Sequence, residues 1–214
     1  MKIESIRAAV RFAGLVLPFV WTSGSFAAQM QATAWASSYG VSVSTATVNQ
    51  KSPSAVLPLG EMMATDQASD VTVNGLVSAQ AAFAIATGDA DGDQSDAGSS
   101  VTLGNVNILG GLITADGVVA MSSSTVGNSN AEGSSLANLV VNGVSLGDPA
   151  PNTRVELPGV GYVVLNEQVS MSGGITVNMI HVVLQQPVLG VFGGVTGYQT
   201  TGDIIVGSAS SSVN

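Results

Sequence analysis

Alternation of polar and apolar residues with a period of two is the feature that most constrains the fold of this chain. It is clear in residues 35–44 (WASSYGVSVS) and in residues 175–179 (ITVNM). A period of two places successive side chains on opposite faces of a β-strand. Gly, Ser, Thr, Val and Asn dominate the chain, whereas Lys and Arg, which favour helices, number only five together. The sequence therefore predicts an all-β protein.

Turn-forming residues separate the alternating segments. Asn74-Gly75 and Asn142-Gly143 each lie between runs of β-branched residues. Asn and Gly tolerate the positive φ angles of a type I′ turn, so both pairs predict β-hairpins. The stretch LGGL at residues 109–112 and the pair Pro158-Gly159 predict two further tight connections. Typical strand lengths then give about ten to twelve strands.

The predicted architecture is an antiparallel two-layer β-sandwich, and a β-solenoid is the alternative. Solenoids repeat with a period of about 20–50 residues. The two similar stretches around Asn74 and Asn142 lie 68 residues apart, with unlike sequences between them. We therefore expect one all-β domain over residues 28–214, compact from Gln31 to Ser208. The small, polar residues 207–214 (GSASSSVN) predict a short flexible C-terminal tail.

The first residues have the layout of a secretory signal peptide. Three basic residues within the first eleven precede the apolar residues 12–21, and SFA at residues 25–27 offers a small-x-small cleavage site. Ten apolar residues are too few to span a bilayer, which needs roughly 20. The sequence predicts a signal peptide of residues 1–27, cleaved after Ala27 or Ala28. The protein is then expected to be secreted.

The charge that remains after cleavage limits the possible partners. Only Lys51 and Arg154 oppose thirteen acidic residues, a formal charge of −11. Nucleic acids and anionic membranes both require basic patches, so neither is an expected partner. No second apolar segment predicts a membrane span or an anchor. We expect an extracellular protein that is either released or retained non-covalently at the cell surface.

Cysteine is absent from the chain. An exported protein without cysteine has no disulfide framework. Its stability is then expected to come from buried apolar surface, from backbone pairing or from a bound metal.

An acidic stretch, GDADGDQSD at residues 88–96, is the candidate metal site. Calcium takes six to eight oxygen ligands, and alternating aspartates on a turn supply several of them. Gln94 and Ser100 occupy the positions where an EF-hand loop needs Gly and Glu, so the stretch is no EF-hand. The alternative is a solvated hairpin tip. The candidate calcium ligands are Asp89, Asp91, Asp93 and Asp96.

Catalytic chemistry has weak support in the sequence. His181 is the only histidine, and no G-x-S-x-G motif accompanies it. The alternation places it on one face with Ile175, Val177, Met179 and Val183. We therefore expect His181 to be a packed, hydrogen-bonded residue. Glu156 and Glu167 are the candidate carboxylate pair of a glycosidase, although few aromatic residues are present to stack on a sugar.

Several blocks of the chain, in order, resemble the bacterial choice-of-anchor P family of exported surface proteins. The blocks are residues 39–43 (YGVSV), 106–118 (VNILGGLITADGV), 139–144 (LVVNGV), 151–161 (PNTRVELPGVG), 164–168 (VLNEQ), 175–181 (ITVNMIH) and 203–207 (DIIVG). The resemblance implies a secreted or surface-displayed domain whose C-terminal anchor varies between members. It implies no catalytic role. The chain departs from the family pattern because it carries no recognisable anchor.

The sequence as a whole predicts an exported structural or interaction protein with a role in adhesion or matrix assembly. Exposed strand edges, together with the small polar residues 122–125 and 127–130, which predict flexible links, suggest self-association by strand addition. The alternative is a calcium-binding or glycan-binding module, and a carboxylate-based hydrolase is a distant third.

Overall fold

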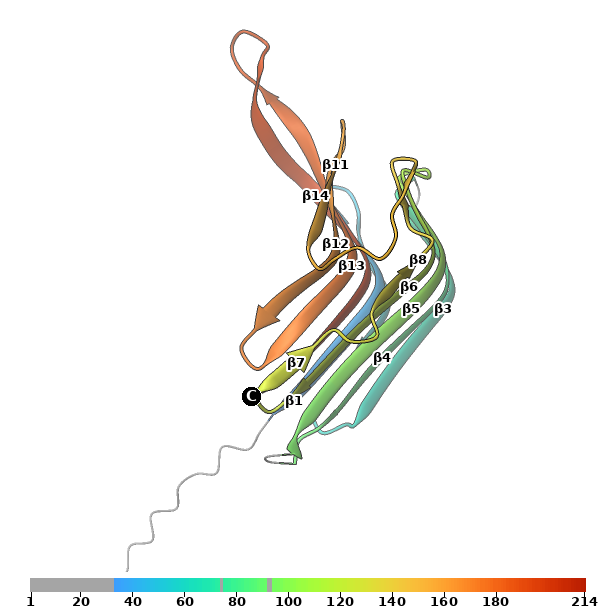
Figure 1. The fold of residues 1–214 in the computed structure, drawn as a ribbon, viewed down its shortest axis with the longest axis vertical. Helices are drawn as coiled ribbons and strands as arrows, with labels where there is room; N and C mark the ends of the chain where they lie inside the picture. The colour runs from blue at the N-terminus through green and yellow to red at the C-terminus, as the bar shows by residue number, and fades with distance from the viewer. Residues whose placement is uncertain (1–32, 74, 92–93) are drawn as a thin grey trace, which may run out of the picture. The chain divides into compact units, whose positions relative to one another are not determined.

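The computed structural model describes residues 33–73, 75–91 and 94–214 of the chain (Figure 1). The predicted signal peptide, residues 1–27, lies outside these residues. Residues Gln31–Asn214 belong to one compact unit. No helix in the described part of the chain is both long and apolar enough to cross a membrane.

Two antiparallel sheets make up the described residues, which contain fourteen strands and no α-helix. The six-stranded sheet consists, in spatial order, of β11 (Thr153–Leu157), β12 (Gly161–Met171), β13 (Gly174–Leu189), β14 (Val195–Val213), β1 (Ala34–Thr45) and β2 (Asn49–Val56). The eight-stranded sheet consists of β10 (Val144–Ser145), β9 (Val140–Val141), β6 (Ile113–Thr125), β5 (Asp96–Ile108), β4 (Val77–Asp89) and β3 (Met63–Val73), with β7 (Asn128–Asn130) and β8 (Ser135–Ala137) paired to β6.

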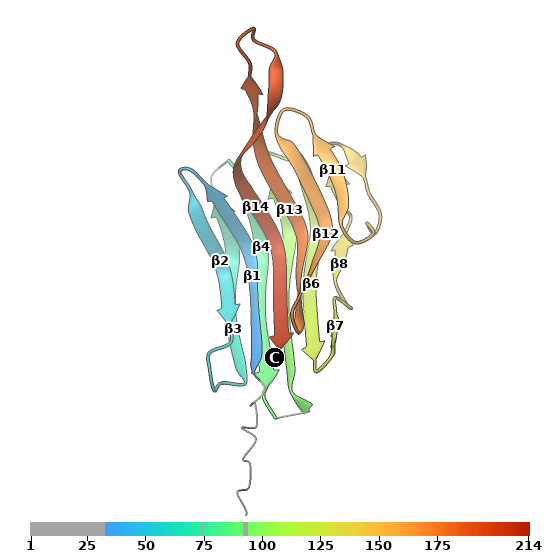
Figure 2. The same cartoon turned by 90° about the vertical axis from the view of Figure 1, so that its left-hand side faces the viewer.

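The two sheets pack face to face, as Figure 2 shows with the six-stranded sheet in front. This confirms the predicted all-β antiparallel sandwich, and the alternative of a β-solenoid is wrong. The strand count exceeds the expected ten to twelve because four strands, β7 to β10, have only two or three residues. Such short strands carry too little alternation to be recognised in a sequence.

The predicted hairpins are present. Asn142 and Gly143 both have positive φ, and Val141 lies opposite Val144, as a type I′ turn requires. Gly75 also has positive φ, in the connection between β3 and β4, whereas Asn74 lies outside the described residues. The LGGL stretch joins β5 to β6, and Pro158-Gly159 joins β11 to β12.

Apolar side chains from both sheets fill the space between them. The largest fully buried residues include Ile108 and Ile113 of the eight-stranded sheet, and Leu165, Ile180 and Ile204 of the six-stranded sheet. Burial of a side chain of this size contributes roughly 1.5–3 kcal/mol. In a chain without cysteine, this core holds the two sheets together, and backbone pairing joins the strands within each sheet.

A bend crosses the six-stranded sheet along one row of residues. The row contains Asn166, Met179, Gly207, Gly40 and Pro53, which lie opposite one another on five neighbouring strands. The strands keep the same register on both sides of this row, but the residues of the row are not themselves paired across the strands. Asn166 and Gly207 have positive φ. In Figure 1 both sheets bend in the same direction, and the outer face of the six-stranded sheet lies on the inside of the bend.

The bend reverses the alternation of side chains along β13. Asn178 and His181 are three residues apart, so a regular strand would place them on opposite faces. Both instead contact the same carboxylate oxygen of Glu167 and therefore lie on one face. The predicted common face of His181 with Ile175, Val177 and Met179 is wrong for this reason.

The predicted flexible tail is also wrong. Residues 207–213 belong to β14, which lies in the middle of the six-stranded sheet between β13 and β1. Ser208, Ser210 and Ser211 are buried. Small side chains are needed at this end of the sandwich because neighbouring strands approach closely: a Cβ on Gly174 would meet the carbonyl oxygen of Ser211.

The small residues of β6 are likewise part of the core. Ser122 and Ser124 are buried and were predicted to be flexible links. Ser124 Oγ donates to the carbonyl oxygen of Ser211 at 3.0 Å, and Ser99 Oγ lies 3.0 Å from Ser122 Oγ. The hydrogen bonds of Ser124 with Ser211 and of Ser99 with Ser210 connect the two sheets, whereas Ser99 and Ser122 lie on neighbouring strands of one sheet. Small polar residues at these positions therefore form a polar layer in the core and not a linker.

Candidate functional site

A two-stranded ribbon extends beyond the six-stranded sheet. Residues 185–189 of β13 pair only with residues 195–200 of β14, because the pairing with β12 ends at Leu184 and the pairing with β1 ends at Gly202. Figures 1 and 2 show the ribbon projecting past the neighbouring strands. Its free end is closed by hydrogen bonds between Gly190 and Gly194 and between Gly193 and Gly190.

The end of the ribbon exposes an unusual number of large apolar side chains. We call this set the apolar tip: Val188, Leu189, Val191, Phe192, Val195 and Tyr198. Val191 and Phe192 are 98% and 101% exposed. Contiguous exposed apolar surface of this kind marks interaction sites in soluble proteins, whereas scattered single residues do not.

The sequence explains why the ribbon is apolar yet remains outside the core. Residues 185–200 (QQPVLGVFGGVTGYQT) contain no charged side chain. Register shifts between Leu184 and Gln185 and between Val188 and Leu189 interrupt regular pairing, and such bulges increase the twist of a strand pair. The ribbon therefore leaves the plane of the sheet before its apolar residues can pack on the sandwich.

A cavity of about 370 Å³ lies at the base of the ribbon, between it and the β11–β12 hairpin. Tyr198 and Pro187 line it from the ribbon, and Pro158 lines it from the hairpin. Arg154 also lines the cavity. Its guanidinium group stacks over the Tyr162 ring, 3.6 Å from the ring centre, and forms an exposed ion pair with Glu156. The base of the ribbon is thus the one described region where a basic side chain adjoins the apolar tip.

A polar cluster surrounds His181 on the outer face of the six-stranded sheet. His181 Nδ1 lies 2.9 Å from Glu167 Oε2, and His181 Nε2 lies 3.5 Å from Asp203 Oδ1. Asn178 Nδ2 donates to the same Glu167 oxygen at 2.6 Å. The prediction that His181 is a hydrogen-bonded residue is confirmed, but its partners are carboxylates on the outer face.

The histidine and the glutamate stabilise each other's charged forms. The hydrogen bond to Glu167 raises the pKa of His181 above its ordinary value, and Asp203 adds to this effect. The hydrogen bond from His181 lowers the pKa of Glu167, and Asn178 adds to this effect. The cluster contains two carboxylates and one base, and the hydrogen bonds of the described residues bring no hydroxyl nucleophile to His181.

This ion pair makes the stability of the fold depend on pH. The raised pKa of His181 means that its contribution is complete below about pH 6.5 and is lost as the pH rises through the folded-state value. The lowered pKa of Glu167 means that its contribution is present above about pH 4.5 and is lost as the pH falls further. We expect His181→Gln to lower the free energy of unfolding more at pH 5.5 than at pH 9, as measured by urea denaturation. An equal loss at both pH values would show that the pair contributes no charge-dependent stability.

The predicted calcium ligands lie at one end of the eight-stranded sheet. Asp89 ends β4 and lies opposite Asp96, which begins β5, while Asp91 is exposed in the connection between them. Asp93 lies outside the described residues. Among the residues that the structure describes, no group of three or more His, Asp or Glu side chains is arranged to hold a metal ion. Calcium binding by this hairpin stays a prediction.

The predicted carboxylate pair is not a pair. Glu156 lies opposite Tyr162, and Glu167 follows Tyr162 by five residues on β12. At about 3.3 Å per residue the two side chains are separated by about 16 Å along the strand. A glycosidase needs its carboxyl groups about 5–9.5 Å apart. Sequence spacing alone could not show this, because it did not reveal that Glu167 lies beyond the short strand β11.

Comparison with protein-family models, with curated proteins and with solved structures finds no match for this chain.

Proposed function

We propose that the protein is an exported, non-catalytic structural or interaction protein that binds its partner through the apolar tip of the β13–β14 ribbon. The observation that carries the proposal is the full exposure of Val191 and Phe192 at the end of a projecting, uncharged ribbon. Burial of such side chains on association supplies the hydrophobic driving force for binding. The proposal keeps the role in adhesion or matrix assembly that the sequence predicts.

The edge of the sandwich formed by β2 and β3 is a less favourable surface for association. β2 and β3 are the edge strands on one side of the sandwich. Asp66 of β3 accepts a hydrogen bond from the backbone N–H of Ser54 at 2.8 Å, which occupies a donor that an added strand would need. A side-chain carboxylate at this position also repels a second acidic chain. The sequence predicted self-association by strand addition, but this edge is not the binding surface that we propose.

Among the described residues, the hydrogen-bond partners of His181 are carboxylates and not hydroxyl groups, and Glu156 is separated from Glu167. Both observations favour a non-catalytic role. The ribbon also explains how an acidic protein associates. Its net charge opposes close approach, but residues 185–200 present no like charge to a partner.

Retention of the protein outside the cell tests this function. We expect Phe192→Ser to move most of the extracellular protein from the cell-associated or matrix-associated fraction into the medium, as measured by quantitative immunoblotting of the two fractions. Val144→Ser is the matched control, because Val144 is also exposed but lies on β10, in the eight-stranded sheet, and is not part of the ribbon. If the two variants are retained to the same extent as the unchanged protein, the apolar tip is not the binding surface.

A further inference from the structure

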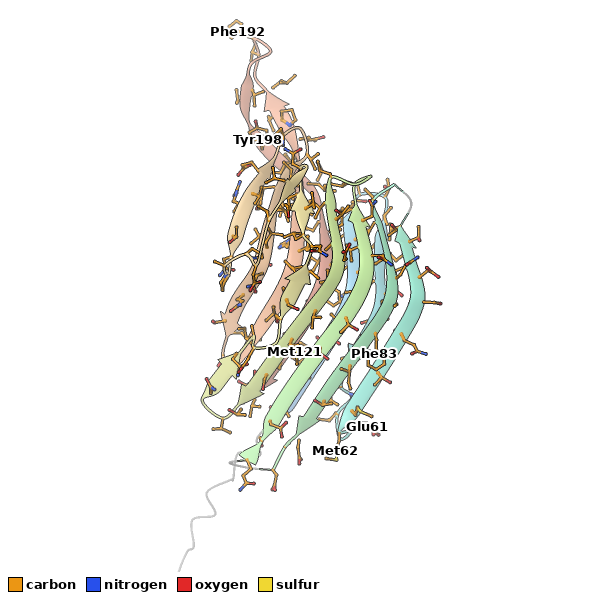
Figure 3. The ribbon with its side chains drawn as sticks, turned by 45° about the vertical axis from the view of Figure 1, so that its right-hand side comes forward. Glu61, Met62, Phe83, Met121, Phe192 and Tyr198 are labelled. Carbon is orange, nitrogen blue, oxygen red and sulfur yellow. The ribbon has the colours of Figure 1, made fainter. Side chains whose placement is uncertain are left out.

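A second exposed apolar site lies at the opposite end of the sandwich from the apolar tip. It is a cavity of about 390 Å³ that we call the end pocket, lined in part by Ala34, Leu57, Pro58, Leu59, Met62 and Gly88. Leu59 and Met62 are among the most exposed large apolar residues of the described chain. Figure 3 shows Phe192 and Tyr198 at one end of the molecule and Glu61 and Met62 at the other.

The two sites are joined by a single strand. β14 begins in the ribbon at Val195 and ends at Val213, which lies opposite Ala34 of the end pocket. Thr33, also in the pocket lining, exchanges two backbone hydrogen bonds with Asn214. One strand thus carries an apolar projection at its start and an apolar recess at its end.

We propose that the apolar tip of one copy of this chain docks into the end pocket of a second copy. This inference rests on the proposed function and names the partner. The copy that inserts its tip leaves its own end pocket open, so the contact is head-to-tail and repeats. Such a heterologous contact generates an open filament unless the rotation between copies closes a ring.

Size and chemistry support the match. A cavity of this volume lies near the lower end of the range of ligand pockets, which suits one or two large side chains. Val191 and Phe192 lie in the turn at the free end of the ribbon, between Gly190 and Gly194, and are almost fully exposed. Aromatic residues that enter a pocket at the centre of an interface commonly dominate its binding energy.

Charge favours the same pairing over contact between two bodies of the molecule. Glu61 and Asp89 lie in the lining of the end pocket, so this end of the molecule is acidic. The ribbon, residues 185–200, carries no charged side chain. An uncharged projection therefore meets an acidic recess without like-charge repulsion. The acidic body likewise disfavours docking of the tip on an anionic membrane.

Mixing two variants tests the inference. We expect the unchanged protein to form oligomers larger than dimers that grow with concentration in sedimentation-velocity experiments. Phe192→Ser removes the tip and Leu59→Ser alters the pocket, and each variant alone should raise the dissociation constant at least tenfold. An equimolar mixture of the two contains one intact tip and one intact pocket, so it should form dimers and nothing larger.

Controls separate this inference from the proposed function. Val144→Ser should assemble like the unchanged protein, and circular dichroism should show that all variants are folded. A protein that is monomeric at every concentration, or a mixture that forms no dimer, would overturn the head-to-tail contact. If flotation with neutral phosphatidylcholine vesicles then shows binding that depends on Phe192, self-docking is wrong while an interaction role for the apolar tip stands.

Discussion

Gly207→Ala should destabilise the protein by about 2–4 kcal/mol. Gly207 has φ +71°, a conformation that costs a residue with a side chain roughly 1–2 kcal/mol. The added Cβ would also lie 2.6 Å from Val118 Cγ1 of the opposite sheet, and overpacking of a core typically costs about 1–3 kcal/mol. Because Gly207 lies in the row where the six-stranded sheet bends, the strain cannot be relieved by moving one strand alone. Urea denaturation of the variant and of the unchanged protein measures the difference.

Gly147→Ala is the matched control for Gly207→Ala. Gly147 has no positive φ, and a Cβ there would meet no atom within 4 Å. The control should change the free energy of unfolding by less than about 0.5 kcal/mol, as surface substitutions usually do. Equal effects of the two substitutions would mean that the bend tolerates a side chain at its centre.

Ser99→Ala should also be strongly destabilising. Ser99 Oγ accepts a hydrogen bond from the backbone N–H of Ser210 at 2.8 Å and lies within hydrogen-bond distance of Ser122 Oγ and of the Ser210 carbonyl oxygen. All three residues are buried. Loss of the hydroxyl group leaves the N–H of Ser210 without this acceptor, and each buried polar group that loses its partner costs about 1–3 kcal/mol. We expect a total loss of about 2–4 kcal/mol in denaturant unfolding.

Ser145→Ala, on an exposed strand, is the control for this substitution and should have little effect. Hydrogen exchange adds a local measurement. The amide of Ser210 should exchange faster in Ser99→Ala than expected from the change in global stability alone. A Ser99→Ala protein as stable as the unchanged protein would mean that the polar layer between the sheets rearranges without cost.

The fold class and most of the hairpins could be predicted from the sequence because they depend on local chemistry. Alternation of period two and the positive φ of Asn-Gly are properties of a few adjacent residues, and Asn142-Gly143 forms the expected turn. Residues 122–125 and 207–213 could not be assigned in this way. Their small polar side chains read as links, and only the close packing of β6 against β14 shows why they are small.

The candidate site was missed for a related reason. An apolar stretch such as residues 185–200 predicts a buried strand. That the neighbouring strands end before this stretch and leave it uncovered depends on the whole sheet and cannot be seen in the local sequence. Its lack of charge, its four glycines and its proline were the available signals of an exposed turn-rich ribbon. The face occupied by His181 was equally hidden, because it depends on a bend whose residues come from five different strands.

The order of strands in the two sheets sets the order in which a chain emerging from the ribosome or from a translocon can complete them. The eight-stranded sheet uses only β3 to β10, which are consecutive in the sequence and end at Ser145. The six-stranded sheet joins β1 and β2 to β11 to β14, so its halves are separated by almost a hundred residues, roughly the length of the other sheet. β1 gains its second neighbour only when β14 arrives, and β14 ends at Val213. The six-stranded sheet therefore stays incomplete until β14, the last of its six strands in chain order, has emerged.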